Sequence, residues 1–317
     1  MENSKHIKKV LIAGASGLIG KKLVAELIYA GYAVIRLVRH PVHKAISERQ
    51  WDPNKNIIHL KDDDEFDIII SLSGANIAKK WTPKYKKELV SSRLNATKVL
   101  SETFAKREKK PSLFISASGG NVYGATSEAA DESAPAGTGF LEDLVVDWET
   151  EANKLSAENI RCVQLRLAAV LDPAGGAIKK MLPAFKFGLG GKLGSGKQMM
   201  SWIDLDDALA AILHIIEHKE LTGPVNITAP KALSNRDFTI CLSNEIGLPA
   251  LFPVPKFIIK LIFGEMGETI LLNDFNIKPT KLSDSGFKWQ YPEIEDSFKK
   301  MNLSGEIIED ENSEAQS

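Results

Sequence analysis

Three closely spaced glycines near the N-terminus are the first residues with an evident chemical use. Gly14, Gly17 and Gly20 follow an apolar run over residues 8–13 and open a helical pattern over residues 18–30. Glycines at this spacing allow a tight turn and a close approach of backbone to a pyrophosphate, and the helix N-terminus supplies N–H groups and a favourable dipole. The strand–loop–helix context predicts a dinucleotide site formed by Gly14, Ser16, Gly17, Leu18, Ile19 and Gly20.

The end of the second apolar run bears on which dinucleotide binds. An acidic residue about 20 positions after the glycines would hold the ribose 2′-hydroxyl of NAD, but no Asp or Glu occurs between Leu27 and Ser47. Arg36 and Arg39 stand there instead, and arginine forms charge-assisted, bidentate hydrogen bonds to phosphate. We therefore expect NADP(H) to be favoured over NAD(H). The alternative is that Arg39 is an ordinary surface charge.

Alternating strands and helices must position these residues. Apolar runs predict strands, and amphipathic patterns between them predict helices. The alternation is typical of parallel βαβ units and predicts an α/β fold with a doubly wound parallel sheet. The expected strands are 8–13, 33–38, 67–71, 113–116 and 161–170, and the expected helices are 18–30, 83–105, 140–157, 177–187 and 204–218. Residues 253–273 are expected to form one further amphipathic helix.

Several longer stretches resemble a known family. The glycine loop, Ser116–Gly124 (SASGGNVYG) and Leu165–Leu171 (LRLAAVL) are similar to extended short-chain dehydrogenases/reductases of the sugar-nucleotide epimerase type. Residues 181–198, 201–207 and 253–292 resemble one branch, the SDR39U1-like and YfcH-like NAD(P)-dependent epimerase-family proteins, whose C-terminal segment is of the DUF1731 type. The resemblance covers about residues 8–300.

The resemblance implies a Rossmann-type sheet with a smaller C-terminal substrate lobe. Residues 1–170 would form the NADP-binding domain, with its core from about residue 8. Residues 171–303 would form mainly the substrate-binding lobe, with some segments returning to the sheet, and residues 304–317 an acidic disordered tail. The further cofactor contacts that the resemblance implies are Ser73, Gly74, Ala75, Arg93, Ala117, Ser118 and Leu167.

The acid–base pair that the superfamily uses is missing. Its reductases are expected to carry Tyr-x-x-x-Lys, in which lysine lowers the tyrosine pKa and tyrosine exchanges a proton with the substrate oxygen. Lysine follows none of the five tyrosines at this spacing. Ser118 and Tyr123 remain as catalytic candidates. The alternatives are that Ser118 is a strand-end serine satisfied by backbone and that Tyr123 packs or contacts the cofactor ribose.

Carboxylates on the expected helix over residues 140–157 are a further source of a base. Glu142, Asp143 and Asp147 lie on this helix, and burial raises the pKa of a carboxylate toward that of a general base. The sequence does not state whether they are buried.

A glycine-rich, basic stretch over residues 188–197 is the candidate for substrate binding. Glycine-rich backbone approaches a phosphate closely, and lysine neutralises it. The matching region of sugar-nucleotide epimerases holds the nucleotide diphosphate, so the resemblance implies a nucleotide-sugar-like or other carbonyl substrate. The alternative is a plain hairpin at Gly194–Gly196. The implied substrate contacts are Lys186, Gly194, Ser195, Gly196, Gln198 and Trp202.

A histidine pair matches a metal motif by chance. His214 and His218 form H-x-x-E-H, an inverted zinc-protease pattern. The surrounding apolar residues instead predict an ordinary amphipathic helix, and no third ligand is evident. We therefore expect no metal.

Composition and charge exclude several classes of protein. The chain is 44% hydrophobic and 26% charged with a net charge of −1, as in an average globular protein. Without Ser304–Ser317, 40 basic residues face 36 acidic ones, far from the basic balance of a nucleic-acid binder. We expect a small-molecule substrate, no nucleic acid, no membrane partner and a cytoplasmic protein; a homodimer is compatible with the sequence.

Two functions from different classes stay open. One is an NADP(H)-dependent oxidoreductase or epimerase-like enzyme with an atypical active site. The other is a catalytically silent NADP(H)-binding sensor or regulatory protein, because the Tyr–Lys pair is absent.

Overall fold

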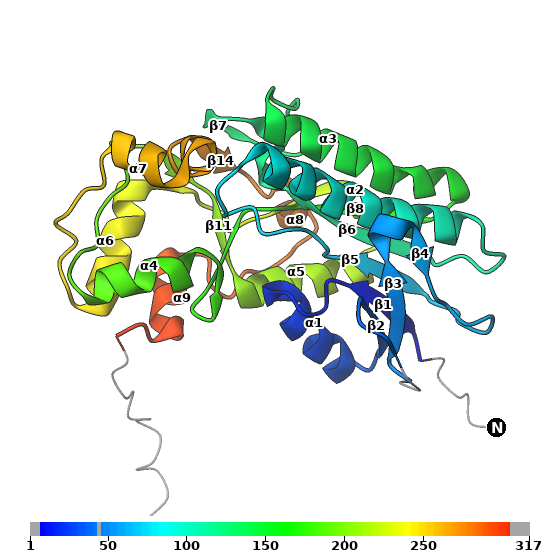
Figure 1. Ribbon diagram of the computed structural model, residues 1–317. Coiled ribbons are helices and arrows are strands. Elements are labelled where there is room, and N and C mark those ends of the chain that lie inside the picture. The colour runs from blue at the N-terminus through cyan, green and yellow to red at the C-terminus, as the bar shows by residue number, and fades with distance from the viewer. Residues whose placement is uncertain (1–6, 43–45, 305–317) are drawn as a thin grey trace, which may run out of the picture.

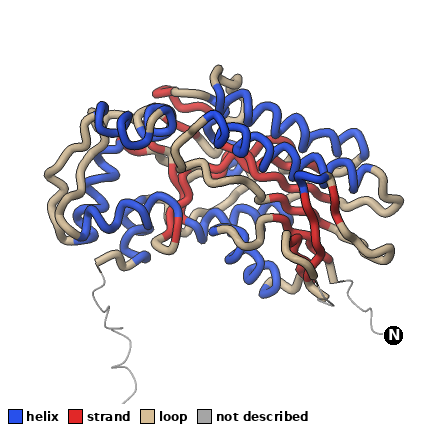
Figure 2. The backbone as a smooth tube through the Cα atoms, in the orientation of Figure 1, coloured by secondary structure: helices blue, strands red, loops and turns tan. Residues whose placement is uncertain are grey.

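A parallel sheet lies at the centre of the molecule. The computed structural model describes residues 7–42 and 46–304, and within them the largest sheet has eight strands, drawn in red between helices in Figure 2. Neighbouring strands run parallel except β3 and β4 at one edge. The sheet order is β12 (Gly223–Ile227), β8 (Arg161–Leu167), β6 (Leu113–Gly119), β5 (Ile68–Ser71), β1 (Lys9–Ala13), β2 (Ala33–Val38), β3 (Glu48–Asp52) and β4 (Ile57–Ile58).

Helices cover both faces of the sheet (Figure 1). α1 (Leu18–Tyr29) and α5 (Leu205–Glu217) pack on one face with Val10 and Ile12 of β1. α2 (Pro83–Ala105) and α3 (Phe140–Asn153) pack on the other with Leu11. A strand buried on both faces has to be apolar at every position, which is why residues 10–13 read as a continuous apolar run. The expected doubly wound, Rossmann-type α/β fold is confirmed.

The strand order creates a crevice at the carboxyl edge of the sheet. From β1 the sheet continues to β2 on one side and to β5 on the other, so the connections that follow these strands diverge. Ligands of open α/β sheets bind at such a switch point, outside the carboxyl ends of the strands. The glycine loop, the end of β2 and the end of β5 all meet there.

A smaller lobe lies beyond this crevice. Its core is formed by buried side chains such as Phe185, Trp202, Phe238 and Phe298. Its helices are α4 (Gly176–Lys186), α6 (Asn235–Ile246), α7 (Lys256–Phe263) and α9 (Ile294–Met301), with a π-helical turn η4 (Gly267–Leu271). The short helix α8 (Thr280–Asp284) packs instead on the sheet, through the buried Leu282. Short paired strands are β9 (Ala169–Asp172) with β11 (Trp202–Asp204), β10 (Met199–Met200) with β13 (Leu233–Ser234), and β7 (Thr126–Ala130) with β14 (Phe275–Ile277). Three 3-10 turns, η1 (Pro53–Lys55), η2 (Gly120–Tyr123) and η3 (Lys154–Glu158), complete the described elements.

Three features differ from the sequence prediction. The strand expected over residues 161–170 is two strands, because β8 ends at Leu167 and the chain then leaves the main sheet to form β9, which pairs with β11. Residues 253–273 do not form one helix, because Gly264 adopts a φ of +61° and ends α7 before η4 begins. The strand β3 was not predicted, because its five residues, ERQWD, include only one apolar residue, Trp51. The predicted acidic tail lies outside the described residues except for Ser304. No described helix is both long and apolar enough to cross a bilayer.

Candidate active site

The glycine loop packs closely against its own backbone and against the backbone that follows β5. Gly14 has a φ of +81°, and the Gly17 N–H donates to the Gly14 carbonyl at 3.0 Å. A Cβ on Gly14 would lie 2.7 Å from the Leu72 carbonyl, and one on Gly20 would lie 2.2 Å from the Gly14 oxygen. No side chain caps the first turn of α1, so its N–H groups face the crevice. This is the geometry that a pyrophosphate needs.

A long cavity of about 890 Å³ runs along this loop. It extends from the start of α1 across the end of β2 to the start of α2. Eight of the residues predicted to bind the cofactor line it: Gly14, Ser16, Gly17, Arg36, Arg39, Ser73, Gly74 and Ala75. Leu18, Ile19 and Gly20 do not line it, and Gly20 is buried beneath the loop.

A charged cluster lies at the β2 end of this long cavity. Arg36 donates to Glu48 at 2.8 Å, and His40 lies 3.5 Å from the other oxygen of the same carboxylate. The register of β2 with β3 places Arg36 directly opposite Glu48. Arg39 is exposed and forms no hydrogen bond or ion pair within the described residues. The sequence analysis missed Glu48, since only the pairing of β3 brings it to the site.

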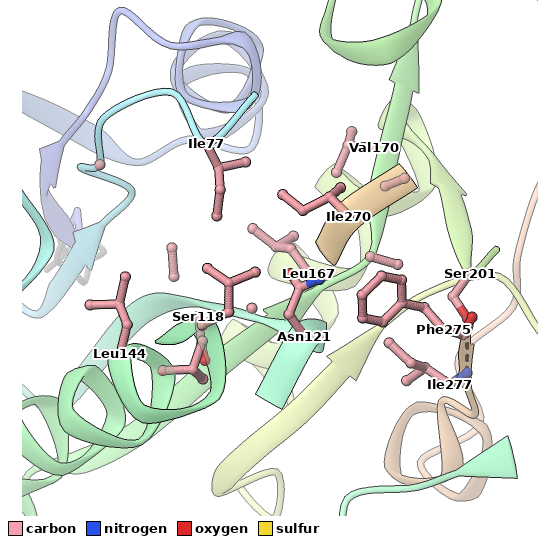
Figure 3. Close-up of a pocket in the computed structure, with 18 of the residues that line it drawn as sticks. Ile77, Ser118, Asn121, Leu144, Leu167, Val170, Ser201, Ile270, Phe275 and Ile277 are labelled. Carbon is pink, nitrogen blue, oxygen red and sulfur yellow. Dashed lines mark hydrogen bonds between the residues drawn. The ribbon is translucent and has the colours of Figure 1, made fainter. Parts of the chain in front are cut away.

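A second cavity of about 440 Å³ adjoins the first, and both are lined by Leu72, Ser73 and Gly74. Its walls are mainly apolar, as Figure 3 shows, with Ile270, Phe275 and Ile277 from the lobe opposite Leu144 of α3 and Leu167 of β8. The predicted cofactor residues that line it are Ser73, Gly74, Arg93, Ala117, Ser118 and Leu167. Asn121 also lines it, was missed by the sequence analysis, and has no side-chain hydrogen bond in the described part of the chain.

The α3 wall of the apolar cavity carries no acid or base. The four α3 residues that line it are Leu141, Leu144, Val145 and Trp148, which follow the helical repeat of one face. Of the predicted carboxylates, Asp143 and Asp147 are exposed to solvent elsewhere. Glu142 is buried but lies beside Gly124 and Gly139 rather than in the cavity. The part of α3 that faces this cavity is therefore apolar.

Ser118 connects the cavity to a buried polar network. Its hydroxyl donates to Glu149 Oε1 at 2.6 Å, and the Arg166 guanidinium holds both oxygens of that carboxylate, each at 2.8 Å. Arg166 also donates to the Tyr123 hydroxyl at 2.9 Å, which donates in turn to Asn226 at 2.7 Å. The two catalytic candidates thus belong to one network. Tyr123 lines neither cavity, and burial raises the pKa of its phenol.

Arg93 is a half-buried cation beside the wall that the two cavities share. Its guanidinium donates to the carbonyls of Leu89 and Ala75 and stacks over the Trp148 ring at 5.3 Å. No carboxylate pairs with it in the described residues, and burial lowers its pKa to about 10. A cation desolvated in this way is stabilised by an anion, and a phosphate group of a bound ligand would supply one.

The six predicted substrate residues lie elsewhere. None of them lines either cavity. Trp202 is buried in the lobe core and donates to the Lys231 carbonyl, and the buried Gln198 amide donates to the carbonyls of Leu193 and Leu271. Gly194 lies against Lys256 of α7, and the buried Gly196 lies against Arg236 of α6, while Lys186 and Ser195 are exposed. Their proposed role in substrate binding stays a prediction.

The histidine pair has local partners. The rings of His214 and His218 stack with centroids 3.6 Å apart, and His214 Nε2 lies 2.8 Å from the Ser285 hydroxyl. No group of three metal-ligating side chains occurs in the described ranges.

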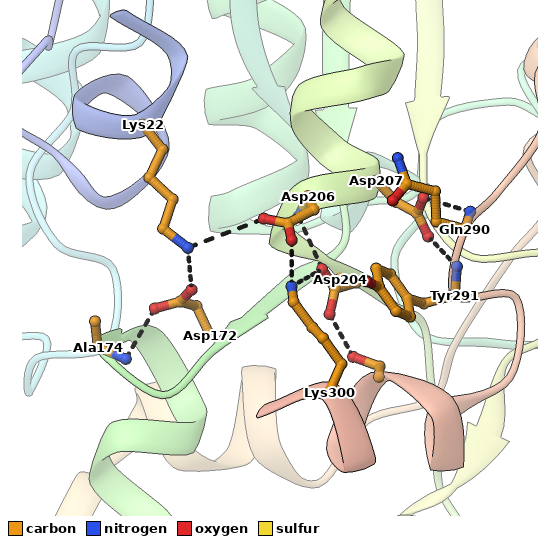
Figure 4. A network of polar contacts seen from close by, with 10 residues as sticks. Lys22, Asp172, Ala174, Asp204, Asp206, Asp207, Gln290, Tyr291 and Lys300 are labelled. Atoms are coloured by element: carbon orange, nitrogen blue, oxygen red, sulfur yellow. Dashed lines mark hydrogen bonds and ion pairs between the residues drawn. The ribbon is translucent and has the colours of Figure 1, made fainter. Parts of the chain in front are cut away.

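The segment 201–207, which carries part of the resemblance, holds the C-terminal helices in place (Figure 4). Buried Asp204 accepts from Ser297 at 2.6 Å and from Lys300 at 2.8 Å, and it caps α5 through the Asp206 N–H. Asp207 accepts the backbone N–H groups of residues 290 and 291. Burial raises the pKa of Asp207. These acids fasten the C-terminal segment to the sheet rather than lining either cavity.

Comparison with known proteins agrees with this geometry. A model of the NAD dependent epimerase/dehydratase family matches residues 10–228, and a model of a domain of unknown function, DUF1731, matches residues 254–301. The chain belongs to the NAD dependent epimerase/dehydratase family. An epimerase family protein of Mycobacterium bovis is 37% identical over 287 residues, which cover 90% of this chain and 94% of the relative. One from Staphylococcus aureus is 32% identical and covers 91% and 97%.

Two solved structures resemble this epimerase-family chain over most of its length. The human epimerase family protein SDR39U1, solved with NADPH, is 28% identical with a TM-score of 0.86, over 93% of this chain and 99% of that one. A nucleoside-diphosphate sugar epimerase from Corynebacterium glutamicum is 26% identical with a TM-score of 0.77, over 94% of this chain and 58% of that one. The predicted resemblance to the SDR39U1-like branch, with its C-terminal DUF1731 segment, is confirmed.

Proposed function

We propose that this epimerase-family protein is an NADP(H)-dependent oxidoreductase that acts on a compact, apolar carbonyl or alcohol. The single observation that carries the proposal is the junction of two unlike cavities at Leu72–Gly74. One is long and lined by glycine backbone and arginines, and the other is short and mainly apolar. When bound, NADP(H) would give or take a hydride where the two cavities meet.

The residues of the long cavity fit a phosphorylated dinucleotide. The glycine loop leaves no space for side chains and presents open N–H groups, which suits a pyrophosphate. Arg39 has no partner in the described chain and would hold a 2′-phosphate. Arg36 is already paired with Glu48 and would contribute less, since this carboxylate competes with the phosphate. Arg93 lies where a phosphate nearer the reactive end would neutralise it.

The second cavity favours a compact apolar substrate over a nucleotide sugar. At about 440 Å³ it is small for a ligand pocket, which commonly spans roughly 300–1,000 Å³. Of its polar side chains, the Ser201 hydroxyl is occupied by the backbone of Phe275 and Ile277. Ser73 and Arg93 lie at the end that adjoins the long cavity, where the cofactor would bind, so Ser118 and Asn121 remain to contact a substrate oxygen. Two such groups are too few to satisfy the many hydroxyls of a buried sugar.

Ser118 and Glu149 would carry the proton. The Ser118 hydrogen points to Glu149, so the serine oxygen can accept the hydrogen of a substrate hydroxyl from the cavity. During oxidation, the substrate O–H proton moves to Ser118 as the serine proton moves to Glu149, while the substrate carbon loses a hydride. The reverse transfers protonate the new hydroxyl during reduction. Arg166 fixes the carboxylate in place for this exchange through its two hydrogen bonds.

Turnover of apolar substrates tests the proposal. The full chain with NADPH is expected to reduce medium-chain aldehydes or ketones, or with NADP⁺ to oxidise the matching alcohols, followed by NADPH fluorescence. Ser118→Ala and Glu149→Gln should each lower kcat by about 100-fold, the scale of lost acid–base catalysis, with an unchanged Kd for NADPH. Asp147→Asn is the matched control on the exposed face of α3. NADPH binding without turnover of any compound would overturn the enzyme proposal in favour of a cofactor-binding sensor, and turnover of nucleotide sugars alone would overturn the substrate class.

Cofactor preference depends on Arg39. Arg39→Ala is expected to weaken NADPH binding by about tenfold or more, because a charge-assisted contact to phosphate contributes roughly 1.5–3 kcal/mol, and to leave NADH binding unchanged. Fluorescence titration of both cofactors measures this. Glu48→Gln is the opposite test and should tighten NADPH binding by releasing Arg36. Equal losses for both cofactors in Arg39→Ala would contradict a 2′-phosphate contact.

A further inference from the structure

The outer side of the lobe exposes an unusual number of large apolar side chains. Of the fifteen exposed large hydrophobic residues in the described chain, eight lie within two segments, 173–203 and 246–264. They include all three exposed phenylalanines, among them Phe187 at 80% and Phe257 at 70% exposure. We call the exposed residues of these two segments the lobe face. Its apolar members are Phe187, Leu189, Leu248, Leu251, Phe252, Phe257, Leu261 and Ile262.

Backbone contacts join the two segments into one surface. The Phe252 N–H donates to the Gly190 carbonyl at 3.2 Å, and the Val254 N–H donates to the Lys192 carbonyl at 2.9 Å. A Cβ on Gly191 would lie only 2.0 Å from the Phe252 oxygen. The backbones of the two segments are therefore in direct contact at this point. In Figure 1 the connection from α6 to α7 runs along the outer edge of the lobe, away from the sheet.

Helix α7 presents its apolar residues in two directions. Ile259 is buried and packs toward Gly267. Phe257 and Leu261 are four positions apart, which places them on one helix face, and both are at least 70% exposed. A helix that is apolar on its outer face as well as its inner one has an outer partner, since contiguous exposed apolar patches mark interaction surfaces.

The charge of the lobe face is of one sign. The two segments contain seven lysines and no aspartate or glutamate. Exposed lysines among the phenylalanines and leucines include Lys186, Lys197, Lys256 and Lys260. The nearest acids along the chain lie just outside the two segments, at Asp172, Asp204, Glu245, Glu265 and Glu268. Asp172 and Asp204 are buried and pair with Lys22 and Lys300, Glu265 pairs with Lys86, and Glu268 pairs with Lys260. The face therefore combines bulky apolar groups with a local excess of positive charge.

This combination identifies the occupant by its chemistry. A second copy of the chain would carry the same lysines and no acid in these two segments, so a two-fold interface on this face would bring no opposite charge to them. Surfaces that lie in a membrane interface and attract anionic lipid instead combine phenylalanine and leucine with flanking lysines. We infer that the lobe face binds the surface of an anionic phospholipid bilayer, with Phe257 and Leu261 entering the headgroup region.

This inference is independent of the proposed oxidoreductase activity, and it reverses the sequence expectation of no membrane partner. The sequence suggested an amphipathic helix over residues 253–273 but could not show that its apolar side stays uncovered. The absence of a membrane-crossing helix among the described residues is compatible with it, because the contact is peripheral.

Vesicle flotation tests the inference with the full chain. The protein is expected to float with vesicles of phosphatidylcholine and phosphatidylglycerol and to bind at least about tenfold more weakly to phosphatidylcholine alone, with binding that falls as salt rises. The double variant F257E/L261E should reduce binding to the anionic vesicles by at least about tenfold. Tyr29→Glu, which changes an exposed apolar residue of α1 outside the lobe face, should bind as the original chain does.

NADPH binding of each variant, measured in the same preparations, verifies that the fold is retained. Failure of the unaltered chain to float with anionic vesicles would overturn the inference, as would equal losses in F257E/L261E and Tyr29→Glu. A concentration-dependent dimer that F257E/L261E abolishes, without vesicle binding, would assign the lobe face to a second copy and likewise overturn it.

Discussion

Replacing Gly20 by alanine is expected to abolish detectable NADPH binding and to lower the free energy of unfolding by about 3 kcal/mol. The added Cβ would lie 2.2 Å from the Gly14 oxygen and 2.9 Å from the Ala15 Cα. Both are backbone atoms, so the loop must move away from α1 to make room. Overpacking of this kind usually costs about 1–3 kcal/mol, and movement of the loop also removes the N–H groups that would face a pyrophosphate.

Two other glycines serve as matched controls for this variant. A Cβ on Gly17 would meet the Gly14 oxygen at 3.3 Å, so Gly17→Ala should weaken binding by less. Gly31 has a φ of +86° but nothing within 4 Å of an added Cβ. Gly31→Ala should therefore cost about 1 kcal/mol of backbone strain and leave NADPH binding intact. Urea unfolding and fluorescence titration measure the two quantities separately, and undiminished binding by Gly20→Ala would contradict the loop assignment.

Replacing Asp204 by alanine is expected to lower the free energy of unfolding by about 3–5 kcal/mol. Asp204 is fully buried and holds Ser297 and Lys300 of α9 as well as the first turn of α5. The variant leaves the buried Ser297 hydroxyl without its acceptor, which costs about 1–3 kcal/mol, and loss of the helix cap adds about 1 kcal/mol. Lys300 loses its buried partner and keeps only the half-exposed Asp206. The C-terminal segment should then detach from the sheet more readily than the rest of the chain unfolds.

Urea unfolding measures the loss, and limited proteolysis locates it in residues 280–304. Asp206→Ala is the matched control, because Asp206 pairs with the same Lys300 at 2.6 Å but remains 38% exposed. Solvent screens such a pair, so its removal should cost less than about 1 kcal/mol. Similar losses in the two variants would show that burial of Asp204 is not what gives the contact its strength.

Local sequence patterns were sufficient for the sheet and for the loop. The apolar runs at β1 and β5 had to be continuous because these strands are covered on both faces. Helix α2 could be read over its full length, 83–105, because Pro83 marks its first turn. The glycine loop is largely local, since the atoms nearest to an added Cβ on Gly17 and Gly20 belong to Gly14 and Ala15.

The tertiary structure alone assigned most partners of these residues. Glu48 reaches Arg36 only through the pairing of β2 with β3, and Glu149 joins Ser118 with Arg166 from another strand. The predicted substrate residues Gln198 and Trp202 instead donate hydrogen bonds to backbone carbonyls within the lobe. No local pattern distinguishes a buried glycine-rich turn from one that lines a cavity.

The sequence by itself determined the α/β sheet, the dinucleotide loop and the absence of a Tyr-x-x-x-Lys pair. These follow from backbone periodicity, from conformations that glycine permits and from residue identities, all of which are properties of neighbouring positions. Only the tertiary structure decided that the second cavity is apolar, that Ser118 faces Glu149 and that Phe257 stays uncovered. Each of these depends on packing between segments far apart in the chain, where burial and shape rather than local spacing select the contacts.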